Sequence, residues 1–138
     1  MTEPAAAVAP AAAVDAHHHV WDLAARDQPW TAGLAPLRRS FSIEDLRPAA
    51  RRGNISATVL VQTVTVAEET PEMLALAAAE PLIAGVVGWT ALDSPAIADT
   101  LAELRELPGG DALVRAGCCP ACCAPGPRRC SIASGQTG

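Results

Sequence analysis

The chain has 138 residues, a net charge of -5 and 50% apolar residues, which is the size and composition of one ordinary globular domain. The acidic balance and the lack of a basic stripe exclude nucleic acid as an expected partner. No apolar stretch approaches the roughly 18 residues of a membrane-spanning helix, so a membrane partner is excluded as well.

The first predicted segment, residues 1–13, is a flexible leader rich in Ala and Pro. A secretory signal needs a basic start and an unbroken apolar stretch. Glu3 is acidic, and Pro4 and Pro10 interrupt the segment. We therefore expect a cytoplasmic protein.

Four segments have the composition of β-strands. They are residues 13–20, residues 55–66, which are rich in β-branched side chains, residues 82–92, and residues 112–116, where a further element begins. Because helical patterns separate them, the order is β-α-β-α-β-α followed by part of a strand. This alternation predicts a parallel sheet covered by helices.

Start signals for helices lie between the strands. Ser42 has Asp45 three residues later, which is a capping pattern, and the helix is predicted to run to about residue 52. Thr70 is predicted as the N-cap of a second helix, with Pro71 at its first position. The third helix is expected from Ser94-Pro95 to about residue 107.

All three histidines lie in the predicted first strand, in the run Asp15-Ala16-His17-His18-His19. Because side chains alternate in a strand, His17 and His19 point to one side and His18 to the other. Two imidazoles at this spacing can both reach one metal ion or one substrate carbonyl. The alternative interpretation is a His-rich loop without a site.

The strand ends supply weaker candidates. Asp15 shares the face of His17, where it either orients a ligand histidine or forms a structural hydrogen bond. Gln62 lies near the end of the second strand and is a candidate for substrate contact. Glu68 and Glu69 are expected in a solvated loop, and the three Trp residues are expected to pack rather than to bind substrate.

Two sheet closures fit the element order, an open doubly wound sheet and a closed (β/α)8 barrel. The open form calls for a Gly-rich phosphate loop after the first strand, and residues 20–30 contain none. A site at the carboxyl end of the first strand is typical of barrel enzymes. The sequence therefore favours the barrel.

Several motifs occur in a characteristic order: Asp15-Ala16-His17-His18-His19-Val20-Trp21-Asp22, Pro29-Trp30, Leu37-Arg38-Arg39 with Phe41, Val61-Gln62, and Val87-Gly88-Trp89. This order resembles the amidohydrolase-related (amidohydrolase 2) TIM-barrel metal-dependent hydrolases, and among them the sugar-lactone and pyrone-dicarboxylate lactonases. The resemblance covers about residues 14–117.

The resemblance implies a hydrolase in which water attacks a small cyclic ester or a similar carbonyl substrate. It implies that His17 and His19 hold a divalent metal such as zinc, and it leaves a metal-independent mechanism open. Family members take a catalytic Asp from the last strand and further histidines from later strands. No such position exists here, so no catalytic residue is assigned to this chain.

A (β/α)8 barrel typically needs about 250 residues, so the resemblance implies a truncated barrel of three βα units. We expect this fragment to be inactive by itself and to be unstable or dependent on a partner, with its oligomeric state left open. All five cysteines lie between residues 118 and 130, within residues 118–138, which are interpreted as an irregular, frameshifted or foreign tail. The alternative function is a non-catalytic Cys-rich metal-binding or interaction protein, because Cys119 and Cys122 have metal-ligand spacing.

Overall fold

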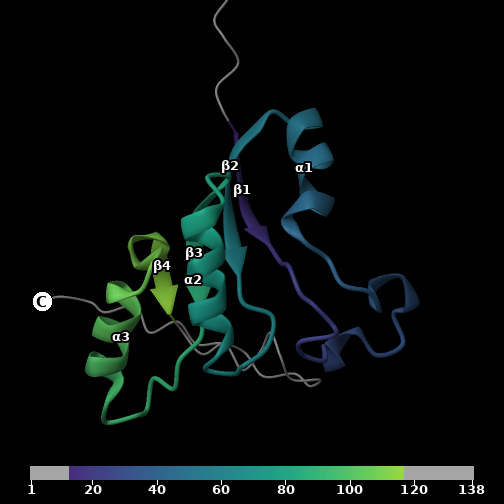
Figure 1. The fold of residues 1–138 in the computed structure, drawn as a ribbon. Coiled ribbons are helices and arrows are strands. Elements are labelled where there is room, and N and C mark those ends of the chain that lie inside the picture. The colour runs from purple at the N-terminus through teal and green to yellow at the C-terminus, as the bar shows by residue number, and fades with distance from the viewer. Residues whose placement is uncertain (1–12, 117–138) are drawn as a thin grey trace, which may run out of the picture.

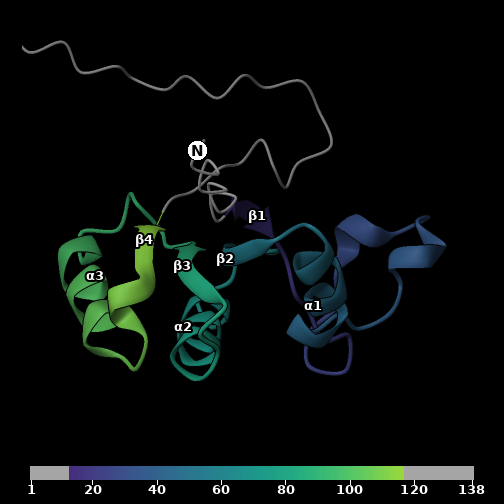
Figure 2. The same cartoon turned by 90° about the horizontal axis from the view of Figure 1, so that it is seen from above.

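The computed structural model describes residues 13–116. They form one four-stranded parallel sheet in the order β1-β2-β3-β4, with the helices on one side (Figures 1 and 2). In chain order, the elements are β1 (Ala13–His18), α1 (Ile43–Arg52), β2 (Ile55–Val61), α2 (Glu69–Ala79), β3 (Ile83–Gly88), α3 (Ile97–Glu106) and β4 (Leu113–Ala116). The predicted βα alternation and partial barrel are therefore confirmed.

The core lies between the sheet and the helices. Leu60 of β2, Leu74 of α2 and Val86 of β3 are completely buried there. The full apolar cluster comprises Ile43, Leu60, Met73, Leu74, Ile83, Val86, Leu104 and Leu113. Among the described residues no helix covers the opposite side of the sheet, which we call the open face (Figure 2).

Helix α1 begins as its capping pattern predicts. The carboxylate of Asp45 accepts a hydrogen bond from the backbone N–H of Ser42 over 2.8 Å. The helix ends at Arg52, and Asn54 then takes a positive φ of 53° that reverses the chain into β2. This part of the fold follows from local sequence.

Several predicted boundaries are wrong. β1 ends at His18 and β3 at Gly88, and β2 ends at Val61 instead of residue 66. After Val61 the backbone N–H groups of Thr63 and Val64 donate to the carboxylate of Glu69 rather than to a neighbouring strand. The β-branched composition of residues 55–66 is compatible with a longer strand. The strand ends at Val61 because the Glu69 carboxylate takes the backbone hydrogen bonds that would continue it.

The predicted start of α2 is also wrong. The helix begins at Glu69, so Thr70 is inside its first turn instead of capping it. The Thr70 hydroxyl lies 2.9 Å from the backbone nitrogen of Trp89 and 3.0 Å from the Trp89 carbonyl oxygen, which joins the helix start to the end of β3. That role depends on a residue far along the chain.

The Cys-rich tail and, apart from Ala13, the predicted leader lie outside the described residues. Ala13 is the first residue of β1. Within residues 13–116, none of the helices is long and apolar enough to cross a bilayer.

Candidate active site

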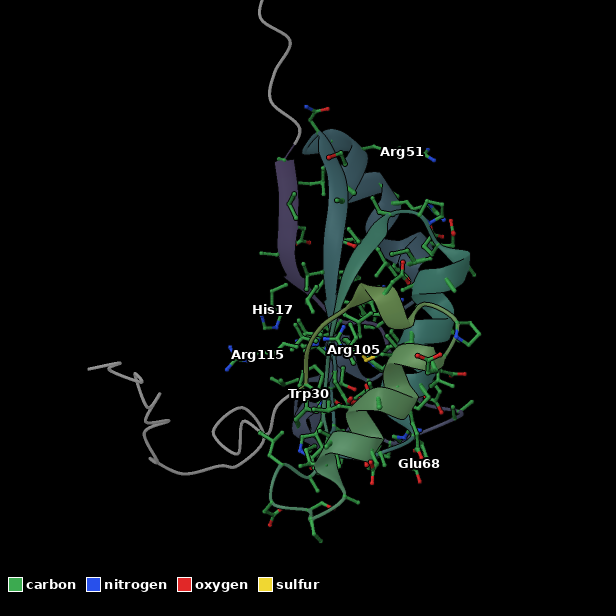
Figure 3. All side chains as sticks on the ribbon, turned by 90° about the vertical axis from the view of Figure 1, so that its left-hand side faces the viewer. His17, Trp30, Arg51, Glu68, Arg105 and Arg115 are labelled. Atoms are coloured by element: carbon green, nitrogen blue, oxygen red, sulfur yellow. The ribbon has the colours of Figure 1, made fainter. Side chains whose placement is uncertain are left out.

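His17 and His19 form a pair at the carboxyl end of β1. Their Nε2 atoms are 3.1 Å apart, and the two rings meet edge to face with centroids separated by 4.8 Å. Figure 3 shows His17 on the open face, on the side of the sheet away from the helices. Strand alternation at i and i+2 therefore brings the two imidazoles together, as the sequence predicts.

The ring of His19 is fixed by the neighbouring strand. Its Nδ1 lies 2.7 Å from the backbone carbonyl oxygen of Val61, the last residue of β2. Because a carbonyl oxygen can only accept, Nδ1 carries the proton and Nε2 keeps its lone pair when the ring is neutral. Burial lowers the pKa of His19 below its usual value, which favours this neutral form at pH 7.

The spacing of the pair fits two ligands of one zinc ion. Zinc–nitrogen bonds of about 2.0–2.1 Å at a tetrahedral angle put two ligand nitrogens about 3.3 Å apart. The observed separation of the two Nε2 atoms is 3.1 Å. Within residues 13–116, however, His, Cys, Asp and Glu side chains nowhere gather in a group of three able to hold a metal. A zinc ion would therefore need further ligands from outside that part of the chain or from water.

His18 has a different role. Only 8% of its surface is exposed, and its Nε2 lies 3.0 Å from the hydroxyl oxygen of Thr58 on β2. Burial lowers its pKa below the usual value, so the ring is held neutral. This hydrogen bond ties β1 to β2 on the side opposite the pair.

Asp15 supports the backbone of the pair. Its Oδ1 accepts a hydrogen bond of 3.1 Å from the backbone N–H of His17. The prediction that Asp15 shares the face of His17 is wrong, because a register shift between Asp15 and His18 breaks the alternation and places Asp15 opposite the buried Thr58, on the side of His18. Orientation of a ligand ring by Asp15 stays a prediction.

The side-chain amide of Gln62 makes hydrogen bonds within the loop that follows β2. Its Nε2 donates to the carbonyl oxygens of Val64 and Val66 over 2.6 and 2.8 Å, and its Oε1 accepts from the backbone N–H of Trp89 over 2.8 Å and from the hydroxyl of Thr70. A substrate contact by Gln62 stays a prediction, and it would require one of these bonds to be exchanged.

Glu69 is the residue that sequence reasoning placed wrongly. It is 5% exposed rather than solvated, and its carboxylate accepts hydrogen bonds from the backbone N–H groups of Thr63 and Val64 and from the Thr63 hydroxyl. The sequence pattern that could have indicated this role is an acidic residue in the first turn of a helix that follows a strand. Glu68 is exposed, as expected.

An aromatic wall stands beside the histidine pair. The ring centroid of Trp30 lies 6.4 Å from that of His19 and 5.3 Å from that of Trp21. Trp21 and Phe41 exchange two backbone hydrogen bonds of 2.9 and 2.8 Å, which close the loop between β1 and α1. The loop therefore holds Trp30 over the site, where 40% of its surface remains exposed.

A pocket of about 480 Å³ lies next to this loop, but neither histidine of the pair lines it. Trp21, Phe41 and Met73 provide apolar wall, and Arg26 crosses to Glu72 of α2 through two hydrogen bonds of 3.0 Å. Its walls come from the β1–α1 loop, the start of α1 and α2. The pocket is thus separate from the pair.

No family model matches the chain. The L-fucono-1,5-lactonase of Burkholderia multivorans is 38% identical over 93 residues, which cover 67% of this chain and 31% of that protein. The L-fucono-1,5-lactonase of Burkholderia ambifaria is 38% identical over 96 residues, covering 69% of this chain and 33% of that protein.

Solved structures agree with these relatives. A crystal structure of an amidohydrolase from Burkholderia multivorans with bound zinc superposes with a TM-score of 0.63 and 36% identity, covering 69% of this chain and 34% of that one. A second crystal structure of such an amidohydrolase, with bound HEPES, gives a TM-score of 0.64. This chain spans about a third of the length of the relatives it matches. Over its matching portion, the chain is a homologue of the lactonase-like TIM-barrel amidohydrolases.

Proposed function

We propose that this chain provides the first-strand histidine pair of a hydrolase in which water opens a small lactone or a similar cyclic carbonyl substrate. The observation that carries the proposal is the pair itself: two Nε2 atoms 3.1 Å apart at the carboxyl end of β1, with His19 oriented by the Val61 carbonyl. The lactonase names of the relatives support the substrate class.

Each residue at the site has a definable task. His17 and His19 present their Nε2 atoms on the open face, where each would either give its lone pair to a divalent metal or, when protonated at Nε2, donate an N–H hydrogen bond to the substrate carbonyl. A zinc ion bound there would polarise a carbonyl and lower the pKa of its water. Trp30 shields one side of the site and restricts access of bulk water.

The general base is the missing component. Apart from Asp15, whose carboxylate accepts from the backbone of His17, no acidic side chain contacts the pair among the described residues. Water attack on an ester needs a positioned base for efficient proton transfer. We therefore propose that the chain alone hydrolyses lactones little or not at all.

The cytoplasmic location of the protein stays a prediction.

Zinc binding by the purified full chain tests the role of the pair. Calorimetric titration with zinc should show weak binding, and the His17→Ala/His19→Ala variant should lose at least tenfold in affinity, because two of the nitrogen donors are gone. The matched control is the Cys119→Ser/Cys122→Ser variant, which should keep the affinity of the wild type. The reverse pattern would support the Cys-rich metal-binding alternative and overturn the proposal.

Hydrolysis is measured separately. With L-fucono-1,5-lactone as the probe, acid release by the zinc-loaded chain should stay near the spontaneous rate. Turnover well above that rate, lost in the His17→Ala/His19→Ala variant, would show that the described residues suffice for catalysis. That result would contradict the proposal that the chain lacks a general base, but it would agree with the proposed role of the histidine pair.

A further inference from the structure

The pocket beside the β1–α1 loop has the size of a small-molecule site. Its volume of about 480 Å³ falls within the range of about 300–1,000 Å³ that such sites occupy. Ile43 of α1 and Met73 of α2 line it, so it lies on the side of the sheet that carries the helices (Figure 2). His17 lies on the open face (Figure 3), and neither histidine of the pair lines the pocket. The proposed hydrolase site therefore leaves this pocket without a role.

The wall of the pocket is apolar and partly aromatic. Trp21 and Phe41 both line it and pack against each other with ring centroids 4.6 Å apart, and the lining side chain of Met73 belongs to the core cluster. Arg39 lies over the Phe41 ring, but it does not line the pocket and its charge is balanced by Asp45 at 2.8 Å. Such a wall suits the apolar body of a ligand, because contact removes apolar surface from water.

Three of the charged side chains that line the pocket already hold partners. The two terminal nitrogens of Arg26 donate to the two carboxylate oxygens of Glu72, each over 3.0 Å. Both oxygens of Glu69 accept from the backbone N–H groups of Thr63 and Val64. A ligand could bind to any of these groups only by displacing a partner.

Asp22 is the remaining charged side chain of the lining. Its Oδ1 accepts hydrogen bonds from the backbone N–H of Ala24 over 2.9 Å and from the Ser40 hydroxyl over 2.8 Å. Within residues 13–116, no arginine pairs with Asp22, and its Oδ2 accepts no hydrogen bond. The bonds from Ala24 and Ser40 lower the pKa of Asp22 below its usual value, so the carboxylate is ionised at pH 7. The pocket thus joins an apolar wall to a negative charge without a counter-ion.

We propose that this pocket binds a small organic cation, in which a primary ammonium group is joined to an apolar body. The ammonium donates to Oδ2 of Asp22, and the body packs against Trp21 and Phe41. A cation close to aromatic rings is also attracted by their faces. A neutral ligand of the same shape lacks the charge-assisted hydrogen bond, and an anion is repelled by Asp22. The pocket therefore selects its ligand by charge, and it does so independently of lactone hydrolysis.

Three probes that share one phenyl body test this selection. At pH 7, 2-phenylethylamine is a cation, 2-phenylethanol is neutral and 3-phenylpropionate is an anion. Ligand-observed NMR titration of the purified full chain in low-salt buffer should give a Kd for the amine about tenfold below that for the alcohol, because a hydrogen bond to a charged group is added. The anion should not bind. Absence of amine binding, or equal affinity for amine and alcohol, would overturn the proposal.

Two substitutions locate the amine in the pocket. Asp22→Asn keeps an acceptor for Ala24 and Ser40 but removes the charge, so the Kd for the amine should rise about tenfold while that for the alcohol stays unchanged. Ala25→Trp fills the pocket and should abolish binding of both probes. Ala24→Trp is the matched control, because Ala24 is the neighbouring exposed residue and does not line the pocket. Unchanged amine affinity in Asp22→Asn, or equal affinity in the two Trp variants, would refute the assignment.

The His17→Ala/His19→Ala variant separates this site from the histidine pair. It should bind the amine as the wild type does, because neither histidine lines the pocket. Loss of amine binding in this variant would place the amine at the histidine pair and overturn the proposal, whatever the zinc titration shows. Circular dichroism on every variant checks the fold, and if Ala25→Trp unfolds, Asp22→Asn decides.

Discussion

Replacing Glu69 by Ala tests the loop that joins β2 to α2. The substitution removes the acceptor of the Thr63 and Val64 N–H groups, which donate over 3.0 and 2.9 Å. A buried donor left without a partner costs about 1–3 kcal/mol. Thr63 is buried, whereas Val64 is half-buried and can recover a water partner. The free energy of unfolding should therefore fall by about 2–4 kcal/mol, a large part of the ~5–15 kcal/mol typical of a domain.

Urea unfolding followed by circular dichroism measures this loss, at one fixed protein concentration because association shifts apparent stability. Glu68→Ala is the matched control. It removes the same side chain one residue earlier, where the carboxylate is exposed and makes no capping hydrogen bond. Its effect should stay within about 0.5 kcal/mol. Equal destabilisation by the two substitutions would refute the buried role of Glu69.

Three further predictions concern stability. Leu60→Ala should cost about 2–5 kcal/mol, because the side chain is completely buried in the core, and a smaller loss in urea unfolding would mean that the core collapses around the cavity. Gly109→Ala should cost at least about 2 kcal/mol in the same assay, since φ is 78° and a Cβ would lie 2.0 Å from the Leu74 carbonyl oxygen; an unchanged urea midpoint would contradict this geometry. Acidification should destabilise the chain. Burial lowers the pKa of His18 and His19, so the unfolded state binds protons first as the pH falls below about 6.5. The urea midpoint should therefore be lower at pH 5.5 than at pH 7.5, and a constant or rising midpoint would speak against buried neutral rings.

Features that depend only on neighbouring residues were predictable from the amino-acid sequence. Strand alternation puts His17 and His19 on one face, and the Ser42–Asp45 spacing starts α1. The regular exchange of strand and helix patterns gave the parallel sheet. These properties require only local geometry, which a sequence pattern records directly.

Hydrogen-bond partners that lie far apart along the chain could be identified only in the folded molecule. The Val61 carbonyl that fixes the ring of His19 comes from another strand, and the contact of Thr70 with Trp89 joins the start of α2 to the end of β3. β-branched composition showed that residues 55–66 can be extended, but the end of pairing at Val61 depends on where Glu69 reaches the backbone. Hydrogen-bond partners and burial are set by packing between distant segments, and no local pattern specifies them.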